Sequence, residues 1–288
     1  MSKRGYEMIN NGKYPSLSSK QTLNHITLPN RIVFPPLNVN YANTDGTVSD
    51  KLMKFYTDLA DGGCGLIITG AAAVSYDSIA SDRGMRIDHD GCVPGLKRLF
   101  SGISRRGSIP GIQLIHCGRQ AANSATGYDL LAPSAIPCPV MSRLDPAYGV
   151  REMTPDDIRM VRSDFIDAAL RAADSGAGVV EMHAAHGYLL NEFLSPYSNH
   201  RSDGYGGDAY NRARLVTEII EGIRDDISRI AISVRVSGDE FVDGGLTPPD
   251  FEEIIPLFED AGMDMLNVSA GVYESFHHDR LERCRISA

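Results

Sequence analysis

The sequence predicts an α/β protein that folds as a parallel β/α barrel of the eight-stranded TIM type. Short, almost uninterrupted apolar runs recur along the chain, and amphipathic helical segments that end at glycine lie between them. Strands that alternate with helices in this way form βαβ units and a parallel sheet. The 288 residues are 42% hydrophobic and 23% charged, and no linker or low-complexity segment divides them. This composition is typical of a globular protein with a full-sized core.

Six strands are predicted. Their apolar character is nearly continuous instead of alternating, as expected for parallel strands that are buried on both faces. They span residues 31–37, 65–74, 110–116, 178–185, 230–237 and 263–271. A closed barrel of this type needs eight strands, so we expect strands seven and eight to be missing from this chain. Residues 1–288 are then a single barrel domain, incomplete at the C-terminus, with its wall open beside the sixth strand.

Three of the intervening helices have clear start and stop signals. They are predicted over residues 49–62, 154–176 and 247–262, and each begins at a serine or threonine N-cap and ends at glycine. Proline follows the cap directly in the last two, where its missing N–H costs nothing. Pro256 lies inside the third helix and should kink it. A doubly wound sheet is the alternative architecture, but no GxGxxG motif follows the first strand.

Composition also limits the partners and the location of the protein. A net charge of −9 and a pI of about 5.4 argue against nucleic acid, which needs a basic surface. No secretory leader and no apolar run of about 18 residues is present, so no membrane partner is expected. The five cysteines are widely spaced without a CxxC pair, which favours reduced thiols in a cytoplasmic protein over disulfides or metal clusters. A homo-oligomer remains possible.

Candidate reactive residues gather at the predicted strand ends. In β/α barrels the chemistry lies at the C-terminal ends of the strands, and six separate segments place polar or small residues there. These residues are Pro36, Leu37, Asn38, Ala71, Gln113, His116, His183, His186, Tyr188, Arg235 and the segment 269–273. Their agreement in position indicates a single site assembled from the whole sheet.

The most specific motif is His183-Ala-Ala-His186-Gly-Tyr188. Two imidazoles three residues apart, on the turn that leaves a strand, can direct two N–H groups at one oxygen. Such a pair would polarise a carbonyl that is conjugated to a C=C bond, and a neutral phenol beside it could supply a proton. A zinc site is the competing interpretation. It is disfavoured because only Glu192 is a nearby third ligand and the HExxH pattern is absent.

Several segments together resemble the Old Yellow Enzyme family, the NADH:flavin oxidoreductases that include 2,4-dienoyl-CoA reductases and enoate reductases. The resemblance covers roughly residues 20 to 275, and its most specific stretch is HAAHGYLLNEFLSPYSNHRSDGYGG. The supporting segments are LPNRIVFPPL, GLIITGAAAV, GIQLIHCGRQ, APSAI and SVRVSGDEFVDGG. The resemblance implies an FMN cofactor, NADH or NADPH as reductant, and a small-molecule substrate with an activated alkene, which accepts hydride from the flavin.

The resemblance also implies roles for individual residues. Pro36 and Leu37 match backbone that lies against the flavin, and Ala71 matches a small residue that lets the ring pack closely. Gln113 matches the amide at the pyrimidine edge of the flavin, and Arg235 the cation beside flavin N1 and O2. A guanidinium there stabilises the anionic reduced flavin and raises its potential.

The substrate side of the site follows the same resemblance. His183 and His186 match the donors to the substrate oxygen, and Tyr188 matches the proton donor. Asn38 stands where relatives often have a cysteine or threonine that tunes the flavin. Relatives hold the FMN phosphate with loops of strands seven and eight. Two alternatives stay open. The chain could be another FMN-barrel oxidoreductase, such as an amine dehydrogenase. Because strands seven and eight are expected to be missing, it could also be a truncated flavin barrel without activity.

Overall fold

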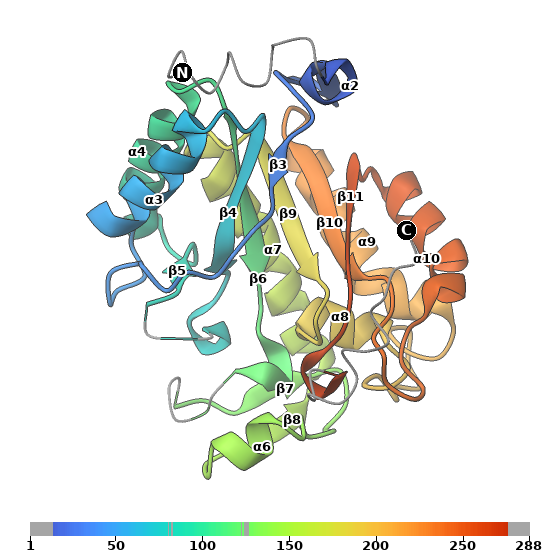
Figure 1. The fold of residues 1–288 in the computed structure, drawn as a ribbon. Coiled ribbons are helices and arrows are strands. Elements are labelled where there is room, and N and C mark those ends of the chain that lie inside the picture. Colours follow the sequence, from blue (N-terminus) through green and yellow to red (C-terminus); the bar gives the residue numbers. More distant parts are fainter. Residues whose placement is uncertain (1–13, 80, 82, 122, 124–126, 276–288) are drawn as a thin grey trace.

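The protein is built on a curled parallel sheet, seen at the centre of Figure 1. The computed structural model describes residues 14–79, 81, 83–121, 123 and 127–275. The main path of this sheet has the order β11-β10-β9-β6-β4-β3, and the short β5 (Met85–Arg86) pairs with β4. The strands of this path are β3 (Val33–Phe34), β4 (Leu66–Ala73), β6 (Ile109–Ile115), β9 (Val179–Ala184), β10 (Ala231–Ser237) and β11 (Met265–Ser269).

All six predicted strands are present, and all of their pairings are parallel. The first is much shorter than predicted, because Pro35 and Pro36 follow Phe34 directly and proline has no N–H for the ladder. In the described part of the chain β3 and β11 are the two ends of the path, so the sheet is an open half-barrel. That two further strands are missing from this protein stays a prediction.

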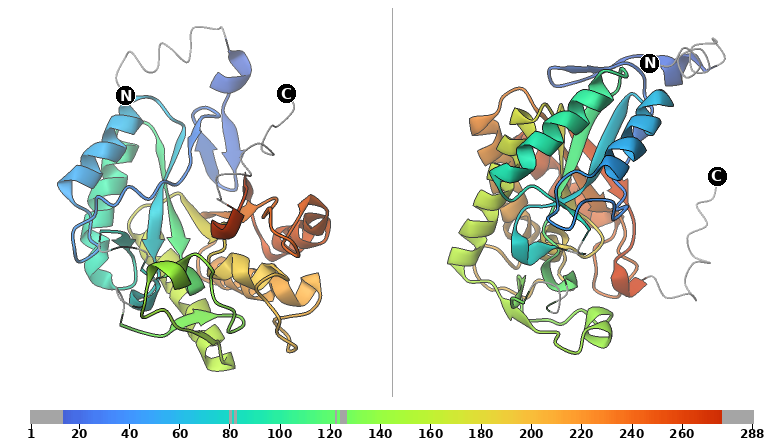
Figure 2. Two further views of the ribbon diagram at one scale, coloured as in Figure 1. Left: turned by 60° about the horizontal axis from the view of Figure 1, so that its bottom comes forward. Right: turned by 90° about the vertical axis from the view of Figure 1, so that its left-hand side faces the viewer.

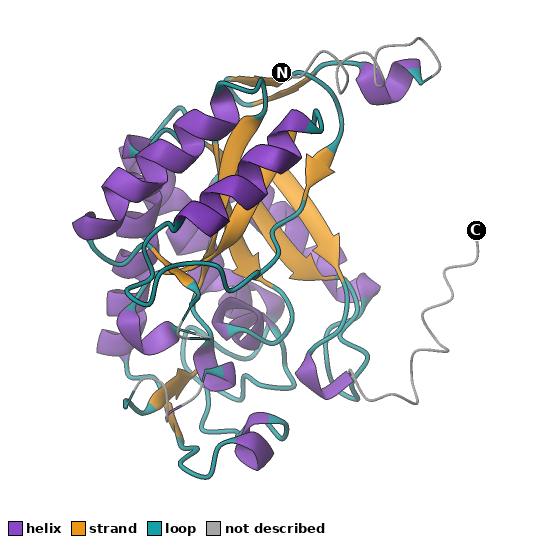
Figure 3. Ribbon diagram, turned by 60° about the vertical axis from the view of Figure 1, so that its left-hand side comes forward, coloured by secondary structure: helices purple, strands orange, loops and turns teal. Residues whose placement is uncertain are grey.

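Helices cover the convex face of the sheet, as Figure 3 shows. The longer ones are α3 (Asp50–Asp61), α4 (Val93–Ser104), α7 (Pro155–Asp174), α9 (Ala209–Asp226) and α10 (Phe251–Ala261). The three predicted N-caps are confirmed. The Ser49 hydroxyl accepts from Leu52 N, and Thr154 and Thr247 each form a reciprocal capping box with the aspartate three residues later. The Thr247 box caps a 3-10 turn, η4 (Pro248–Asp250), and α10 with Pro256 follows it.

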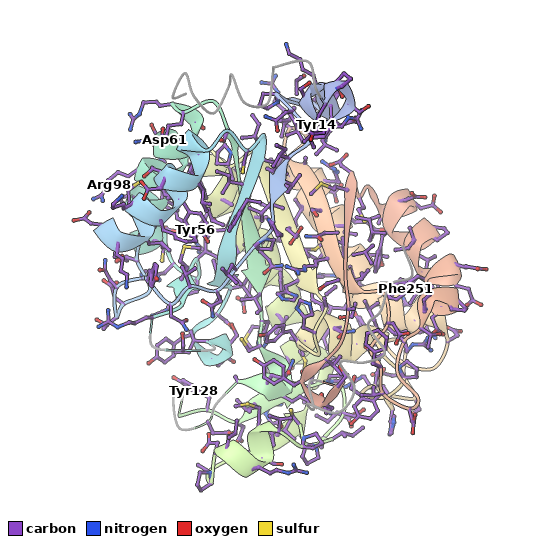
Figure 4. All side chains as sticks on the ribbon, in the orientation of Figure 1. Tyr14, Tyr56, Asp61, Arg98, Tyr128 and Phe251 are labelled. Carbon is purple, nitrogen blue, oxygen red and sulfur yellow. The ribbon has the colours of Figure 1, made fainter. Side chains whose placement is uncertain are left out.

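Side chains fill the space between these helices and the sheet (Figure 4). Tyr56, labelled there, extends from α3 toward β4 and is fully buried. Its hydroxyl accepts a hydrogen bond from Gly70 N at 3.0 Å, next to the predicted cofactor residue Ala71. The outer core therefore supports the β4 backbone at the point where the candidate site begins.

Two smaller additions lie at the two ends of the half-barrel, and neither is predicted by the apolar runs. The hairpin of β1 (Gln21–Leu23) and β2 (Ile26–Leu28) places Leu28 against Leu66 and Val179 at the N-terminal end. The parallel pair β7 (Leu130–Ala132) and β8 (Val150–Glu152), with α6 (Met141–Leu144), lies at the other end. Figure 2 shows the two additions at opposite ends of the sheet. Within the described residues, no helix is long and apolar enough to cross a membrane.

Candidate functional site

A cavity of about 250 Å³ opens at the C-terminal ends of the strands. Its lining contains nine of the ten single residues named at the predicted strand ends, and these nine come from five strands or the turns that follow them. The segment 269–273 is not in this lining. The lining residues are Pro36, Leu37, Asn38, Ala71, Ala73, Ile79, Gly84, Met85, Gln113, Ile115, His183, His186, Tyr188 and Arg235. His116, also noted at a strand end, is buried outside this lining, and its Nε2 lies 3.9 Å from Asp77 Oδ1.

The Gln113 amide at the floor of the cavity is held by a buried carboxylate. Its Nε2 donates to Glu181 Oε1 at 2.9 Å, and Glu181 Oε2 accepts from Ser233 Oγ at 2.9 Å and Asn267 Nδ2 at 3.0 Å. These four side chains lie on β6, β9, β10 and β11 and join the strands across the interior. Burial raises the pKa of Glu181, although the three hydrogen bonds and Arg235 act in the opposite direction. Because all three partners donate, the network suits an ionised carboxylate.

Arg235 projects from β10 into the cavity without forming an ion pair among the described residues. Its Nη1 donates to Pro36 O at 3.3 Å and its Nη2 to Ser269 Oγ at 3.2 Å, whereas the buried Nε has no hydrogen-bond partner. Burial lowers the pKa of Arg235, and the charge of Glu181 partly offsets this effect. A half-buried guanidinium that lines the cavity and forms no ion pair among the described residues fits an electron-rich ligand edge. With the Gln113 amide and the apolar Pro36 and Ala71 beside it, this donor set fits the flavin of FMN.

The loop that carries His186 is held by backbone contacts on both sides. His186 has a φ of 60°, its N donates to Ser237 Oγ at 2.9 Å, and its O accepts from Gln120 Nε2 at 2.8 Å. Gly187 follows with a φ of 78°, and a Cβ there would lie 2.9 Å from Gln120 Nε2. Gly187 N donates to Asn191 Oδ1 at 2.6 Å. A side chain here would strain the backbone and displace Gln120, so glycine is favoured after His186.

The two imidazoles converge as the sequence predicts. His183 Nε2 and His186 Nδ1 lie 3.4 Å apart, with the rings nearly perpendicular at 79°. Burial lowers the pKa of His183 well below its usual value, and burial together with Arg235 lowers that of His186 to about 4. Both rings are thus neutral near pH 7. An oxygen placed beside these two nitrogens would lie within hydrogen-bond reach of both.

Tyr188 lies against this pair and is linked to a second phenol. Its ring packs edge-on against His183, with 4.7 Å between centroids, and its hydroxyl lies 3.2 Å from that of Tyr273. Burial raises the pKa of Tyr188 above its usual value, so the phenol keeps its proton at neutral pH. Tyr273 follows β11 in the segment 269–273 that the sequence also places at the site.

Glu192, the third ligand of the zinc alternative, faces a different part of the protein. Its Oε1 accepts from Arg119 N at 2.9 Å, in the loop after β6. The one group of three possible ligand atoms within 4.8 Å of one another, among the residues that the structure describes, is Asp88, His89 and Cys92. Asp88 already forms an ion pair with Arg86 there. The histidine pair of the cavity is not part of such a group.

Sequence reasoning missed Glu181 and left Ser269 without a role. Glu181 lies in the middle of an apolar strand, GVVEMHAA, and is fully buried. A carboxylate in such a run is costly unless it is hydrogen-bonded, and this was the signal that could have identified it. Ser269 has no comparable signal, because its contact with His186 joins residues 83 positions apart in the chain.

Comparisons with known proteins agree with this geometry. Residues 21–280 match the NADH:flavin oxidoreductase / NADH oxidase family. The chain is 38% identical to an NADH oxidase from Thermoanaerobacter brockii, over 91% of this chain and 40% of that protein. It is 39% identical to an NADPH dehydrogenase from Listeria innocua, over 88% of this chain and 73% of that protein.

A solved structure of the same family has a similar fold. An Old Yellow Enzyme from Pichia sp. AKU4542 superimposes with a TM-score of 0.81 at 28% identity, over 88% of this chain and 70% of that one. The predicted family, the oxidoreductase class and the use of FMN with NADH or NADPH are thereby confirmed at the level of the family. This chain belongs to the NADH:flavin oxidoreductase family of Old Yellow Enzyme homologues.

Proposed function

We propose that this protein uses NADH or NADPH, through FMN, to reduce the C=C bond of an α,β-unsaturated carbonyl compound such as an enone, an enoate or a dienoyl-CoA. The observation that carries the proposal is the convergence of two neutral imidazoles, with 3.4 Å between His183 Nε2 and His186 Nδ1. They lie in the same cavity as the Gln113 amide and the Arg235 guanidinium. Residues 1–288 would act as one flavin-binding domain.

The cofactor side of the proposal assigns the polar edge of the flavin to two groups. Gln113 would pair with the edge through its amide, and Arg235 would place a fixed positive charge beside it. Pro36, Leu37 and Ala71 would supply the apolar walls against which the ring packs, with Asn38 at the rim. When bound, FMN supplies the hydride chemistry that the protein side chains lack.

The substrate side assigns binding and proton transfer to the histidine loop. The carbonyl oxygen of the substrate would accept hydrogen bonds from His183 and His186, whose interaction strengthens as negative charge develops on that oxygen. Neutral imidazoles suit this role because each carries one N–H that can donate to the oxygen. Tyr188, whose raised pKa keeps it protonated, would donate a proton to the α-carbon.

The test is a turnover experiment on the FMN-loaded protein under anaerobic conditions. We expect 2-cyclohexen-1-one to oxidise NADH or NADPH and to be converted to cyclohexanone in equal amounts. A cinnamate and a 2,4-dienoyl thioester, compared in the same assay, would rank the substrate classes. Flavin that NAD(P)H reduces but none of these alkenes reoxidises would contradict the proposal, as would a protein that binds no FMN.

A further inference from the structure

Ser269, the last residue of β11, connects the proposed flavin side of the cavity with the proposed substrate side. Its Oγ lies 3.2 Å from Arg235 Nη2 and 2.6 Å from His186 Nε2. Arg235 lies on β10 and His186 follows β9, so the hydroxyl bridges groups from two different segments of the chain. The roles above leave this bridge unexplained.

The hydrogen bonds at this hydroxyl have a defined direction. A guanidinium can only donate, so Arg235 occupies an oxygen lone pair of Ser269. The hydroxyl has one hydrogen of its own, and His186 Nε2 is the acceptor beside it. The opposite arrangement, in which His186 Nε2–H donates to Ser269, would leave that hydrogen without an acceptor among the described contacts. The nearby guanidinium also polarises the O–H bond and makes it a better donor.

This direction determines where His186 carries its proton. A neutral imidazole has one N–H and one acceptor nitrogen, so accepting at Nε2 leaves the hydrogen on Nδ1. On the partner ring, Ala185 N donates to His183 Nδ1 at 3.4 Å, which leaves the hydrogen of His183 on Nε2. Nδ1 of His186 and Nε2 of His183 are the two nitrogens that converge. Both rings would then direct an N–H at the same point, and these two donors cannot bond to each other. In the other tautomer of His186, His183 Nε2–H would instead donate to His186 Nδ1 across the same 3.4 Å.

We propose that Ser269 is a positioning residue that holds His186 in the Nδ1–H tautomer, so that both histidines donate to one substrate oxygen. The other tautomer would present the Nδ1 lone pair to that oxygen and repel it. The tautomer assignment is argued from the contacts of Ser269, whereas its consequence for catalysis rests on the proposed function.

The chain offers a matched control in a second serine that contacts the same histidine. Ser237 Oγ accepts from His186 N at 2.9 Å and donates to Gly271 O at 2.8 Å. Ser237→Ala therefore removes a serine contact of similar length from His186 but leaves the ring nitrogens with their partners. Ser269→Thr keeps the hydroxyl and serves as the conservative variant.

The primary experiment is ¹⁵N NMR of the imidazole nitrogens in FMN-loaded protein, where protonated and unprotonated ring nitrogens resonate far apart. His186→Gln assigns the signals of this residue among the eight histidines of the chain. We expect a protonated Nδ1 and an unprotonated Nε2 in the wild type, in Ser269→Thr and in Ser237→Ala. Ser269→Ala should shift the population toward Nε2–H. A wild-type His186 protonated at Nε2, or a Ser269→Ala spectrum like that of the wild type, would overturn the inference.

The kinetic experiment separates this inference from the proposed function. Ser269→Ala should slow cyclohexenone reduction by less than the roughly hundredfold that loss of a whole donor costs, because part of the population keeps the productive tautomer. Ser269→Thr should restore the rate. Should the wild type reduce no alkene while the NMR result holds, the proposed function fails and the tautomer assignment stands. Should alkenes be reduced while the tautomer is unaffected by Ser269, the inference alone fails.

Discussion

Two buried histidines and one partly buried histidine are expected to lower the stability of this protein in acid. Burial lowers the pKa of His183 well below its usual value and brings those of His116 and His186 to about 4. The unfolded chain takes up these protons near pH 6.5, its ordinary histidine value. Since the unfolded state then binds more protons than the native state, stability falls as the pH decreases from about 6.5 to about 4.

His186→Gln tests this dependence. We expect the free energy of unfolding of the wild type to decline over this pH range, and the variant to decline less because one of the three sites is gone. Urea denaturation at a series of pH values measures both slopes. His25→Gln is the control, because His25 is exposed in the β1–β2 hairpin. Equal slopes for His186→Gln and the wild type would show that the His186 ring is not held neutral.

Glu192 has the opposite pH dependence. Burial raises its pKa to about 8, and its Oε2 has no partner among the described groups. A carboxyl whose pKa is raised on folding contributes stability below about pH 4.5, its unfolded value, and loses it as the pH rises through 8. Glu192→Gln, which never ionises, should therefore gain stability relative to the wild type between pH 5 and pH 8. Chemical denaturation at both pH values measures this, and an unchanged difference would contradict the assignment.

The site residues that lie close together in the sequence could be predicted, whereas contacts between residues far apart in the sequence could not. His183, His186 and Tyr188 lie within six residues and are recognisable as one motif. The bonds of Glu181 to Gln113 and Ser233 connect residues 68 and 52 positions apart, so they depend on strand register. A one-residue shift of register would turn these side chains to the other face of the sheet. Such partnerships cannot be predicted before the pairing of the strands is known.

At the scale of elements, helix starts were predicted better than strand lengths. The capping box of Thr154 has a local sequence pattern, and its residues form the expected bonds. The strand predicted over residues 31–37 is reduced to β3 because Pro35 and Pro36 interrupt the ladder. The β1–β2 hairpin was missed because its strands have only three residues each, and its turn uses Asn24 with a φ of 50° instead of glycine.

The cap of α7 provides a test at this scale. Thr154 Oγ1 accepts from Asp157 N at 3.2 Å, while Asp157 Oδ2 accepts from Thr154 N at 2.7 Å. Thr154→Ala should lower the free energy of unfolding by about 1 kcal/mol, as measured by urea denaturation. Thr154→Ser keeps the cap and should retain most of that stability. A Thr154→Ala variant as stable as the wild type would show that the box is not formed in solution.

At the scale of the whole molecule, alternating strands and helices were enough to predict the architecture. Parallel pairing in chain order brings the ends of β3, β4, β6, β9 and β10 to one edge, and the predicted site residues lie on these strands or directly after them. The β7–β8 pair was not predictable, because its two strands have only three residues each and interrupt the regular alternation of strands and helices. The functional groups thus come from five different strands or the turns that follow them, and the site forms only when the sheet does.

The central claim is that His183 and His186 act on the substrate and not on the flavin. Hydride transfer to the flavin should need little from this pair, whereas alkene reduction builds negative charge on the oxygen that the pair binds. Losing one such donor typically costs roughly 100- to 1000-fold in rate. His25→Ala, on the exposed hairpin, is the control.

The measurement that tests this most directly is anaerobic stopped-flow of the two half-reactions in the His183→Ala, His186→Ala double variant. We predict that reduction of the flavin by NAD(P)H stays within a few-fold of the wild-type rate. Its reoxidation by cyclohexenone should slow by at least about 100-fold. Equal slowing of both half-reactions would show that the histidines support the flavin or the fold, and would contradict the claim.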